Sequence, residues 1–396
     1  MSRLWDKGGD LDGKILKFTA GNDVVLDRRL VPFDIQASIA HVAMLEHVNL
    51  IASQEATLLS RTLTEIGTDF GDGKWEIQPE DEDCHTAIEG QLVKRLGDLG
   101  GKVHLGRSRN DQVLVALRLY LNEEINKLRE ANRGVRESLK NLIEQQGATK
   151  IPGYTHGQQA MPSSVALWAL GFESELKNSA SLLDAAHHLA DQCPLGSAAG
   201  YGTPGLSLDR QFVSEQLGFS RVQEPVTACQ LSRGKAESAL LFATTHLLSD
   251  VGRLAADVCL FASQEFGFVT LAEEVSTGSS IMPQKRNPDV FELIRAHASQ
   301  APHDLAALLA LTAKMPSGYH RDLQLMKEVL FRGIDRAQVT LEITAYAITK
   351  IQFHAKRAEQ ITQPGIHAAE AAFALVQQEG ISFREAYRRV AKQTLG

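Results

Sequence analysis

The chain has 396 residues, of which 43% are hydrophobic and 22% are charged. These ordinary globular values exclude a disordered or low-complexity chain, and the length allows two or three domains that share a large core. Binding to a phosphate backbone takes a cluster of positive side chains, so the balance of 41 Lys and Arg against 48 Asp and Glu, with no basic block, argues against nucleic acid as a partner.

No segment predicts a membrane or secretory protein. The most apolar stretch, residues 305–313, is far shorter than the roughly 20 residues that span a bilayer, and residues 1–13 lack the apolar part of a signal peptide. We therefore expect a soluble, cytoplasmic protein. Its four cysteines are scattered and show no metal-ligand spacing, so we expect buried free thiols: Cys84, Cys193, Cys229 and Cys259.

The first segment, residues 1–105, is expected to form an N-terminal helical domain. Its acidic run at residues 80–83 lacks the spacing and the glycine of a calcium loop. Acidic side chains before a helix are stabilised by the helix dipole. We therefore interpret the run as the start of a helix and predict no metal there.

A long helix is the strongest structural signal in the sequence. Between Asn110 and Gln146 there is no proline and only one glycine, and apolar residues recur at steps of three and four. Such a helix is roughly 50 Å long at 1.5 Å per residue. Similar stretches predict further long helices at residues 163–192, 226–266, 289–301 and 322–361.

These helices predict an all-α fold, since no segment alternates apolar and polar residues as a strand does. We expect a central long-helix bundle at 106–361 and a short C-terminal helical domain at 362–396. Helices of this length need apolar partners along their whole length, and other subunits are a ready source, although a monomeric bundle is the alternative. The glycines between residues 196 and 205 are interpreted as a flexible connection, because no phosphate-binding GK[ST] motif follows them.

The segment from Ser276 to Pro288 is the richest in chemistry. It combines hydroxyl groups, a lysine and an asparagine, with a proline that can open the next helix. It could also be a plain polar loop with turn-forming serines. A lone serine is a poor base until its surroundings lower its pKa, so the residue types alone leave both interpretations open.

The amino-acid sequences of this segment and of several others resemble those of a known family. GSSIMPQKRNP at 278–288 resembles the signature loop of the fumarase/aspartase superfamily. GRSRNDQ at 106–112, IPGYTHGQ at 151–158 and EDCHTAIE at 82–89 are similar to segments of the argininosuccinate lyase family. Tyr319, Gln324 and Lys327 repeat the spacing of that family's YxxDxQxxKE stretch, so the resemblance extends along nearly the whole chain.

The resemblance implies an all-helical homotetramer of the fumarase/aspartase type, with active sites shared between subunits and no metal or organic cofactor. The implied reaction is the reversible elimination of argininosuccinate to arginine and fumarate. It requires a base, cationic groups for the carboxylate intermediate, and an acid for the departing nitrogen. The resemblance assigns Ser279 as the base, Lys285 and Asn287 to the intermediate, His156 to the acid, and Glu292 to the orientation of that histidine.

The remaining matches are expected to hold the substrate. Arg109, Asn110 and Thr155 can donate hydrogen bonds to carboxylate oxygens, and arginine can do so with two parallel bonds. By resemblance, the other substrate-binding residues are His85, Tyr319, Gln324 and Lys327.

Two departures from the family pattern affect the substrate. Asp23 stands where many members have a serine that contacts the substrate, and Gly157 replaces a leucine. A carboxylate at residue 23 could repel a succinyl carboxylate or bind the amino group of the substrate. The alternatives are a lyase for another N-substituted aspartate and an inactive, crystallin-like structural relative.

Overall fold

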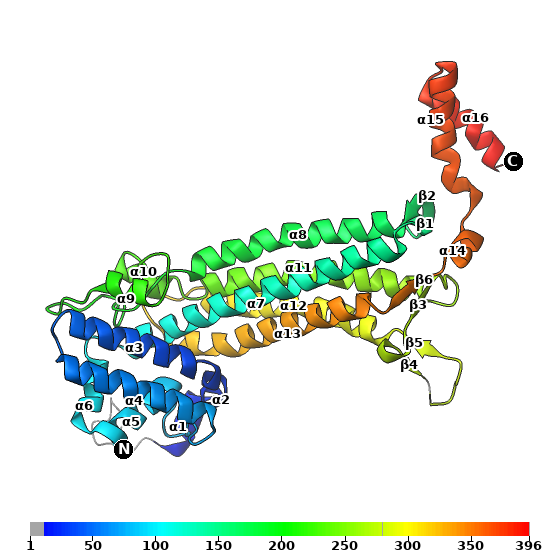
Figure 1. Cartoon of the computed structure of the whole chain (residues 1–396). Coiled ribbons are helices and arrows are strands. Elements are labelled where there is room, and N and C mark those ends of the chain that lie inside the picture. Colours follow the sequence, from blue (N-terminus) through cyan, green and yellow to red (C-terminus); the bar gives the residue numbers. More distant parts are fainter. Residues whose placement is uncertain (1–11, 279, 396) are drawn as a thin grey trace. The chain divides into compact units, whose positions relative to one another are not determined.

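The computed structural model describes residues 12–278 and 280–395. Helices dominate this part of the chain, as predicted, and the few strands form two-stranded sheets (Figure 1). The chain divides into two compact units. Unit 1 comprises Met1–Lys127, Leu182–Thr244 and Pro302–Asp335, and unit 2 comprises Leu128–Ser181, Thr245–Ala301 and Arg336–Gly396.

Short helices build the N-terminal part of unit 1. α3 packs against α4 and α5, and its buried face includes Ile35, Val42 and Leu45. The acidic run does start a helix, since the Asp83 carboxylate caps α5 by accepting the backbone N–H of Thr86 at 2.8 Å. The helices of this part are α1 Gly13–Ala20, α2 Asp23–Leu26, η1 Asp27–Arg29, α3 Val31–His47, α4 Ser53–Gly71, α5 Cys84–Leu96, α6 Asp98–Gly101 and η2 Lys102–His104.

The long helices agree with the sequence prediction in two cases. α7 covers Arg109–Gln146, which confirms the helix predicted from Asn110, and α8 covers Val165–Ala190. The next helix was predicted too long, because the segment that starts at residue 226 forms α10 Val226–Leu231 and then α11 Lys235–Phe261. Gly234 lies between them with φ +85°, and a Cβ there would lie 2.3 Å from the Thr312 side chain.

Two further predictions of helix bounds were wrong. α12 runs over Asp289–Thr312 and continues through Pro302, where we expected it to end. A proline inside a helix removes one backbone hydrogen bond and its ring crowds the carbonyl four residues earlier. The buried side chains of Ala301 and Leu308 offset this cost by packing on both sides of Pro302 in the sequence. The helix predicted to reach residue 361 is α13, which ends at Ile348. A short strand and another helix follow it, β6 Ile351–Phe353 and α14 Ala355–Ile361.

A β-hairpin in unit 2 forms where we predicted no strand. β1 Lys150–Thr155 pairs antiparallel with β2 Gln158–Ser164. The two turn residues, His156 and Gly157, have φ of +54° and +72°, the backbone required by a type I′ turn. Period-two alternation failed to reveal these strands because each is exposed or half-buried over most of its length.

The other elements are short. β3 Val269–Leu271 pairs with β6, and β4 Thr277–Gly278 pairs with β5 Arg286–Asn287. The rest are α9 Arg210–Gln216, η3 Glu273–Val275, η4 Arg321–Leu325 and η5 Pro364–His367. Cys84, Cys193 and Cys229 are buried free thiols, as expected, whereas Cys259 is half-buried. Among the described residues, no helix combines the length and apolar character that crossing a membrane requires.

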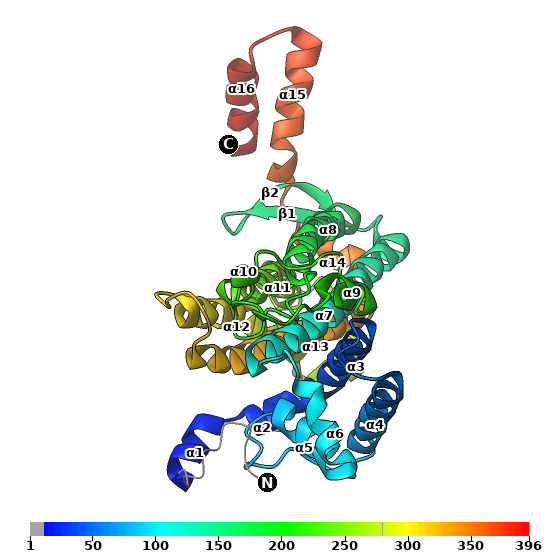
Figure 2. The same cartoon turned by 90° about the vertical axis from the view of Figure 1, so that its left-hand side faces the viewer.

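The C-terminal segment forms a helical hairpin. α15 Ala368–Glu379 packs against α16 Phe383–Leu395 (Figures 1 and 2), and Ala372, Ala386 and Val390 form its small core. Gly380 ends α15 in the left-handed conformation, at φ +67°. The predicted boundaries at 105 and 361 remain predictions.

Glycine allows two helices of unit 2 to approach closely. A Cβ on Gly252 of α11 would lie 2.6 Å from the Cβ of Ala298 on α12. By contrast, a Cβ on Gly134 of α7 would lie 3.8 Å from the Cβ of Ala345, an ordinary contact.

We expect Gly252→Ala to lower the free energy of unfolding by about 1–3 kcal/mol, because the added methyl group overpacks the interface between α11 and α12. Gly134→Ala is the matched control, and it should leave stability unchanged or raise it by about 0.5–1 kcal/mol, since alanine favours a helix interior. Urea unfolding of both variants tests the close approach of α11 and α12 at Gly252. Equal unfolding midpoints for the two variants would contradict this close approach.

Candidate active site

A polar cavity of about 170 Å³ in unit 1 collects the predicted substrate-binding residues of that unit. The predicted residues in its wall are His85, Arg109, Asn110, Tyr319, Gln324 and Lys327. They come from three separate stretches of the chain, and the fold brings all six to one cavity. The rest of the wall is formed by Asp23, Asp27, Glu82, Asp83, Val113, Arg233 and Arg321.

The start of α7 is held in place by a buried carboxylate. Asp111 Oδ1 accepts the backbone N–H of Ser108 at 2.9 Å, and Oδ2 accepts those of Gly196 and Ala198 at 3.0 and 2.8 Å. Burial raises the pKa of Asp111 to about 6, against the lowering effect of these donors. The glycine-rich segment is therefore fixed to the first turn of α7, the turn that presents Arg109 and Asn110.

Lys327 forms two buried ion pairs in the wall of the cavity. Its Nζ donates to Asp27 Oδ1 at 2.5 Å and to Asp23 Oδ2 at 2.7 Å, and the residue is only 4% exposed. Burial disfavours the ammonium group, but Asp27 and Asp23 outweigh it and raise the pKa of Lys327. Burial also raises the pKa of Asp23 to about 6, with Lys327 acting in the opposite direction and Asp27 adding to the rise.

His85 pairs with a second buried carboxylate. Its Nδ1 lies 2.9 Å from Asp34 Oδ2, and both side chains are almost fully buried. Burial lowers the pKa of His85, but Asp34 outweighs it and the net shift is upward. The charged imidazolium is thereby favoured, with Nδ1 as the donor to Asp34.

Other predicted residues bind groups of the protein itself. Arg109 Nη1 donates to Asp83 Oδ2 at 3.0 Å. Gln324 Nε2 donates to the carbonyls of Thr19 and Ala20 at 2.9 and 3.0 Å, so this side chain joins η4 to the end of α1. The Tyr319 ring lies 6.0 Å from the guanidinium carbon of Arg233.

Sequence reasoning missed several wall residues. Glu82 and Asp83 were interpreted only as acids before a helix, yet both also line the cavity. Asp27 lies one helical turn after Asp23, a spacing that could have linked the two. Arg233 belongs to no motif, and the fold alone brings its 6%-exposed side chain to the site.

The remaining predicted residues lie in unit 2. Thr155 and His156 are exposed at the tip of the β1–β2 hairpin. Lys285 and Asn287 lie at the β4–β5 segment and Glu292 in the first turn of α12, while Ser279 lies outside the described residues. Figure 1 shows the hairpin and the β4–β5 segment apart from each other. Among the described residues, no hydrogen bond or ion pair joins His156 to Glu292.

Three side chains of unit 1 have ligand atoms close enough for a metal ion. Atoms of Asp27, Cys84 and His85 lie within 4.8 Å of one another. Each has another role: Asp27 binds Lys327 and accepts the backbone N–H of Cys84 at 3.3 Å, and His85 binds Asp34. Burial raises the pKa of the Cys84 thiol well above its ordinary value, which disfavours the thiolate that a metal needs. We assign no metal to this cluster.

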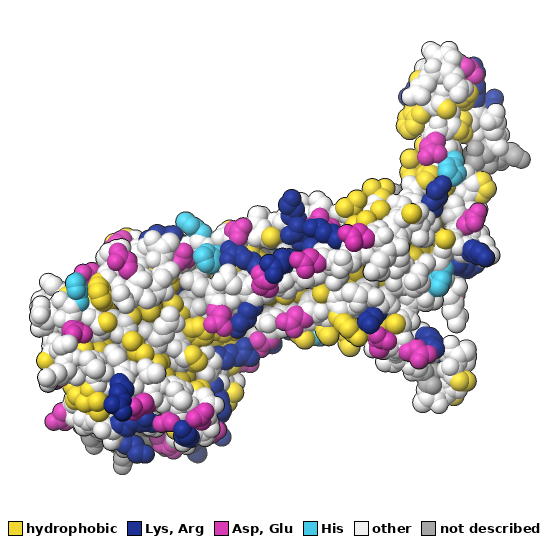
Figure 3. Space-filling view, in the orientation of Figure 1, with side chains coloured by type: hydrophobic (Ala, Val, Ile, Leu, Met, Phe, Trp, Pro, Cys, Tyr) yellow, Lys and Arg dark blue, Asp and Glu magenta, His cyan; other side chains and the backbone are white. Residues whose placement is uncertain are grey.

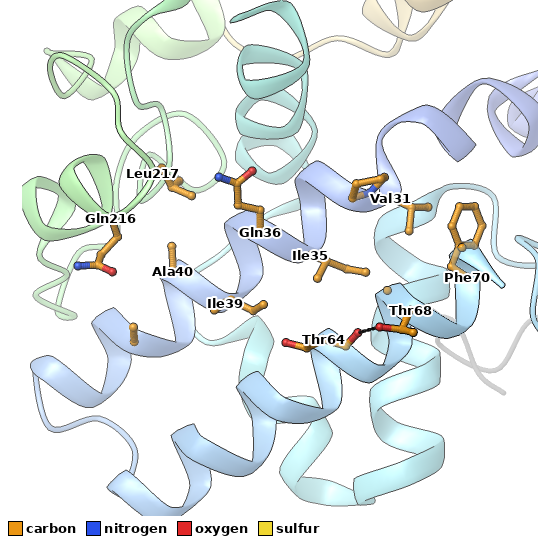
Figure 4. Close-up of a pocket in the computed structure, with 14 residues that line it drawn as sticks. Val31, Ile35, Gln36, Ile39, Ala40, Thr64, Thr68, Phe70, Gln216 and Leu217 are labelled. Atoms are coloured by element: carbon orange, nitrogen blue, oxygen red, sulfur yellow. Dashed lines mark hydrogen bonds between the residues drawn. The ribbon is translucent and has the colours of Figure 1, made fainter. Parts of the chain in front are cut away.

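A larger cavity in unit 1, of about 480 Å³, has a different character. Figure 4 shows Ile35 and Ile39 of α3 facing Thr64 and Thr68 of α4. None of its wall residues is ionisable. The charged cavity is therefore the better candidate for a substrate that carries carboxylates.

Residues 18–302 match the model of a protein family described as Lyase, so the chain is a lyase. An argininosuccinate lyase of Thermotoga neapolitana is 41% identical over 99% of this chain and 98% of its own length. One from Sorangium cellulosum is 44% identical over 99% of this chain and 90% of its own length. The chain belongs to the argininosuccinate lyase family, which confirms the resemblance found in the motifs.

Solved structures confirm the fold class. An EDDS lyase in complex with formate has a TM-score of 0.81 at 24% identity, covering 97% of this chain and 76% of that one. A class II fumarase from Schistosoma mansoni has a TM-score of 0.80 at 17% identity, covering 96% of this chain and 88% of that one. The all-α fold predicted from the long helices is therefore the fumarase/aspartase fold.

We expect Lys327→Met to lower the free energy of unfolding by about 3–5 kcal/mol at pH 8, because it leaves the buried Asp23 and Asp27 without a counter-charge. The loss of unfolding free energy caused by this substitution should be smaller at pH 5. Burial already raises the pKa of Asp23 to about 6, and loss of the Lys327 ammonium group removes the main interaction that lowers it. A carboxyl whose pKa is raised by folding costs stability as pH increases through its titration range. Urea unfolding at the two pH values measures both effects.

Lys102→Met is the matched control for this substitution. Lys102 is half exposed and pairs with Glu55 at the surface. Removal of such a pair should change the unfolding midpoint little at either pH. Equal losses of unfolding free energy in the two variants would show that the buried ion pairs of Lys327 contribute no more to stability than a surface ion pair.

Proposed function

We propose that the chain catalyses the reversible elimination of argininosuccinate to arginine and fumarate. The observation that carries this proposal is the charged cavity, in which the six expected substrate-binding residues of unit 1 lie together. The argininosuccinate lyases that are 41–44% identical over nearly the whole chain support the same substrate. The wall carries Arg109, Arg233, Arg321 and Lys327, which suit a ligand with several carboxylates.

In this proposal the unit 2 residues carry the chemistry. Ser279 removes the proton from the carbon beside a carboxylate, and Lys285 and Asn287 stabilise the negative charge that develops. His156 donates a proton to the departing guanidino nitrogen, and Glu292 orients the imidazole. An ammonium group and an amide donor are suitable groups for an intermediate that carries additional negative charge.

The substrate is held by both groups of residues. Arg109, Asn110 and Thr155 bind carboxylate oxygens, with His85 close to the same site. Lys327, Gln324 and Tyr319 face the amino-acid end and the guanidino group. The cavity supports this part of the proposal, since all of these except Thr155 line it.

We also propose a cytoplasmic homotetramer that shares its active sites between subunits. The predicted residues fall into two compact units of one chain, which suits a site completed by neighbouring chains. Apolar side chains are exposed on the long helices, for example Leu167 at 63% and Leu170 at 49% on α8. Figure 3 shows hydrophobic side chains gathered over the end of α8 near the hairpin. Such side chains favour burial against another subunit.

The direct test follows fumarate formation from argininosuccinate by absorbance, with EDTA-treated protein. We expect activity in the wild type and a loss of roughly a thousandfold or more in kcat for Ser279→Ala, because a proton-transfer group acts mainly in the transition state. Substrate binding, measured by calorimetry, should be nearly unchanged in this variant.

Ser280→Ala is the matched control, since it removes a hydroxyl from the adjacent residue. It should retain most of the activity. Comparable losses in the two variants would show that the base is wrongly assigned. Fumarate release from another N-succinyl amine, with none from argininosuccinate, would instead overturn the substrate.

Complementation tests the shared site. His156→Asn and Ser279→Ala are each expected to be inactive, and asparagine tolerates the φ of +54° found at residue 156. After the two are unfolded together and reassembled at equal amounts, about a quarter of wild-type activity should return, because each motif is drawn independently from a mixed pool. A mixed tetramer, verified by light scattering, that remains inactive would contradict sharing between subunits.

A further inference from the structure

Asp23 presents an unused carboxylate oxygen at the cavity wall. It is the first residue of α2 and is 7% exposed. Its Oδ2 binds Lys327 at 2.7 Å, whereas no hydrogen bond to its Oδ1 occurs among the described residues. Asp27 differs, because its two oxygens bind Lys327 and the backbone N–H of Cys84, and it is fully buried. Asp27 is thus occupied by the protein, while Asp23 has capacity for a ligand.

The charges around Asp23 favour a cation. Two carboxylates, Asp23 and Asp27, share the single ammonium group of Lys327, so this end of the cavity holds an excess negative charge. The direction of the Asp23 pKa agrees, since burial and Asp27 both act against its ionised form. A positively charged ligand group would neutralise the excess.

Elsewhere in the wall the cavity is suited to an anion. Arg233 is 6% exposed, and its Nε and Nη1 have no hydrogen-bond partner among the described residues. A cavity with an excess carboxylate and a buried guanidinium group, two of whose nitrogens have no hydrogen-bond partner in the described part of the chain, matches a ligand that carries both an ammonium and a carboxylate. The amino-acid end of argininosuccinate carries both.

We propose that Asp23 is a specificity-determining residue that binds the α-ammonium group of the substrate through Oδ1. This inference rests on the proposed function and names the group of the substrate that residue 23 recognises. The opposite interpretation, in which Asp23 repels a succinyl carboxylate, does not explain why a second carboxylate is buried on Lys327. Recognition of the ammonium group restores the balance of two positive and two negative charges.

The test compares two ligands that differ only in the amino group. L-arginine carries it, and 5-guanidinopentanoate is the same molecule without it. We expect the wild type to bind arginine roughly 10- to 100-fold more tightly by calorimetry, the usual range for a charge-assisted hydrogen bond in a desolvated site. In Asp23→Asn this preference should nearly disappear through weaker binding of arginine, with the affinity for 5-guanidinopentanoate changed by less than about threefold.

Two further variants complete the design. Glu80→Gln removes an exposed negative charge from the segment that supplies Glu82 and Asp83, and it should keep the wild-type preference. Asp23→Glu restores the charge on a longer side chain and should recover part of the preference that Asp23→Asn loses. Far-ultraviolet circular dichroism and the urea midpoint identify any variant that has not folded.

The possible results are distinct. Tighter binding of both ligands to Asp23→Asn would support repulsion and overturn the proposal. An equal loss of affinity for both ligands would show that Asp23 only positions Lys327. This result would also overturn the proposal. A wild type that releases fumarate from argininosuccinate but binds both ligands equally would reject the role of Asp23 alone. The absence of fumarate release would count against the proposed function instead.

Discussion

The buried contact between Lys327 and the carboxylates of Asp23 and Asp27 determines how the site of unit 1 is built. It joins the first turn of α13 to residues about 300 positions earlier in the chain. Removing three charges from water is costly, and a hydrophobic replacement of similar volume is often as stable. The stability of the fold therefore does not explain why these residues are charged. Their place in the cavity wall does explain it, because a site for a charged ligand needs charges that are already desolvated and held in position.

The surrounding structure serves to hold these charges still. The Asp111 carboxylate fixes the glycine-rich segment to the start of α7, and Gln324 joins η4 to the end of α1. Both contacts use backbone groups, so they position main chain and not only side chains.

The sequence predicted features that depend on local pattern. The 38 residues of α7 were recognised because their apolar positions repeat at the helical period. The break between α10 and α11 was missed although Gly234, a residue type that often interrupts helices, marks it in the sequence. The ion pairs of Lys327 could not be inferred, because Asp23 and Asp27 lie about 300 residues away in the sequence. The motifs located six residues of the cavity, yet the two acids at 82 and 83 escaped notice, since a helix-capping role explained them sufficiently.

The exposure of the unit 2 residues bears on how such chemistry can work. His156 and Lys285 are exposed in the single chain. Two unit charges 4 Å apart interact by only about 1 kcal/mol in water, and by several times more at the lower effective dielectric near protein. A lysine that stabilises a carboxylate intermediate therefore contributes little until other groups exclude the solvent around it. The cavity of unit 1 already provides buried charges, whereas His156 of the hairpin and Lys285 of the β4–β5 segment, which are proposed to carry the chemistry, are exposed. A surface that excludes water from both segments is the physical requirement, and a neighbouring subunit can meet it.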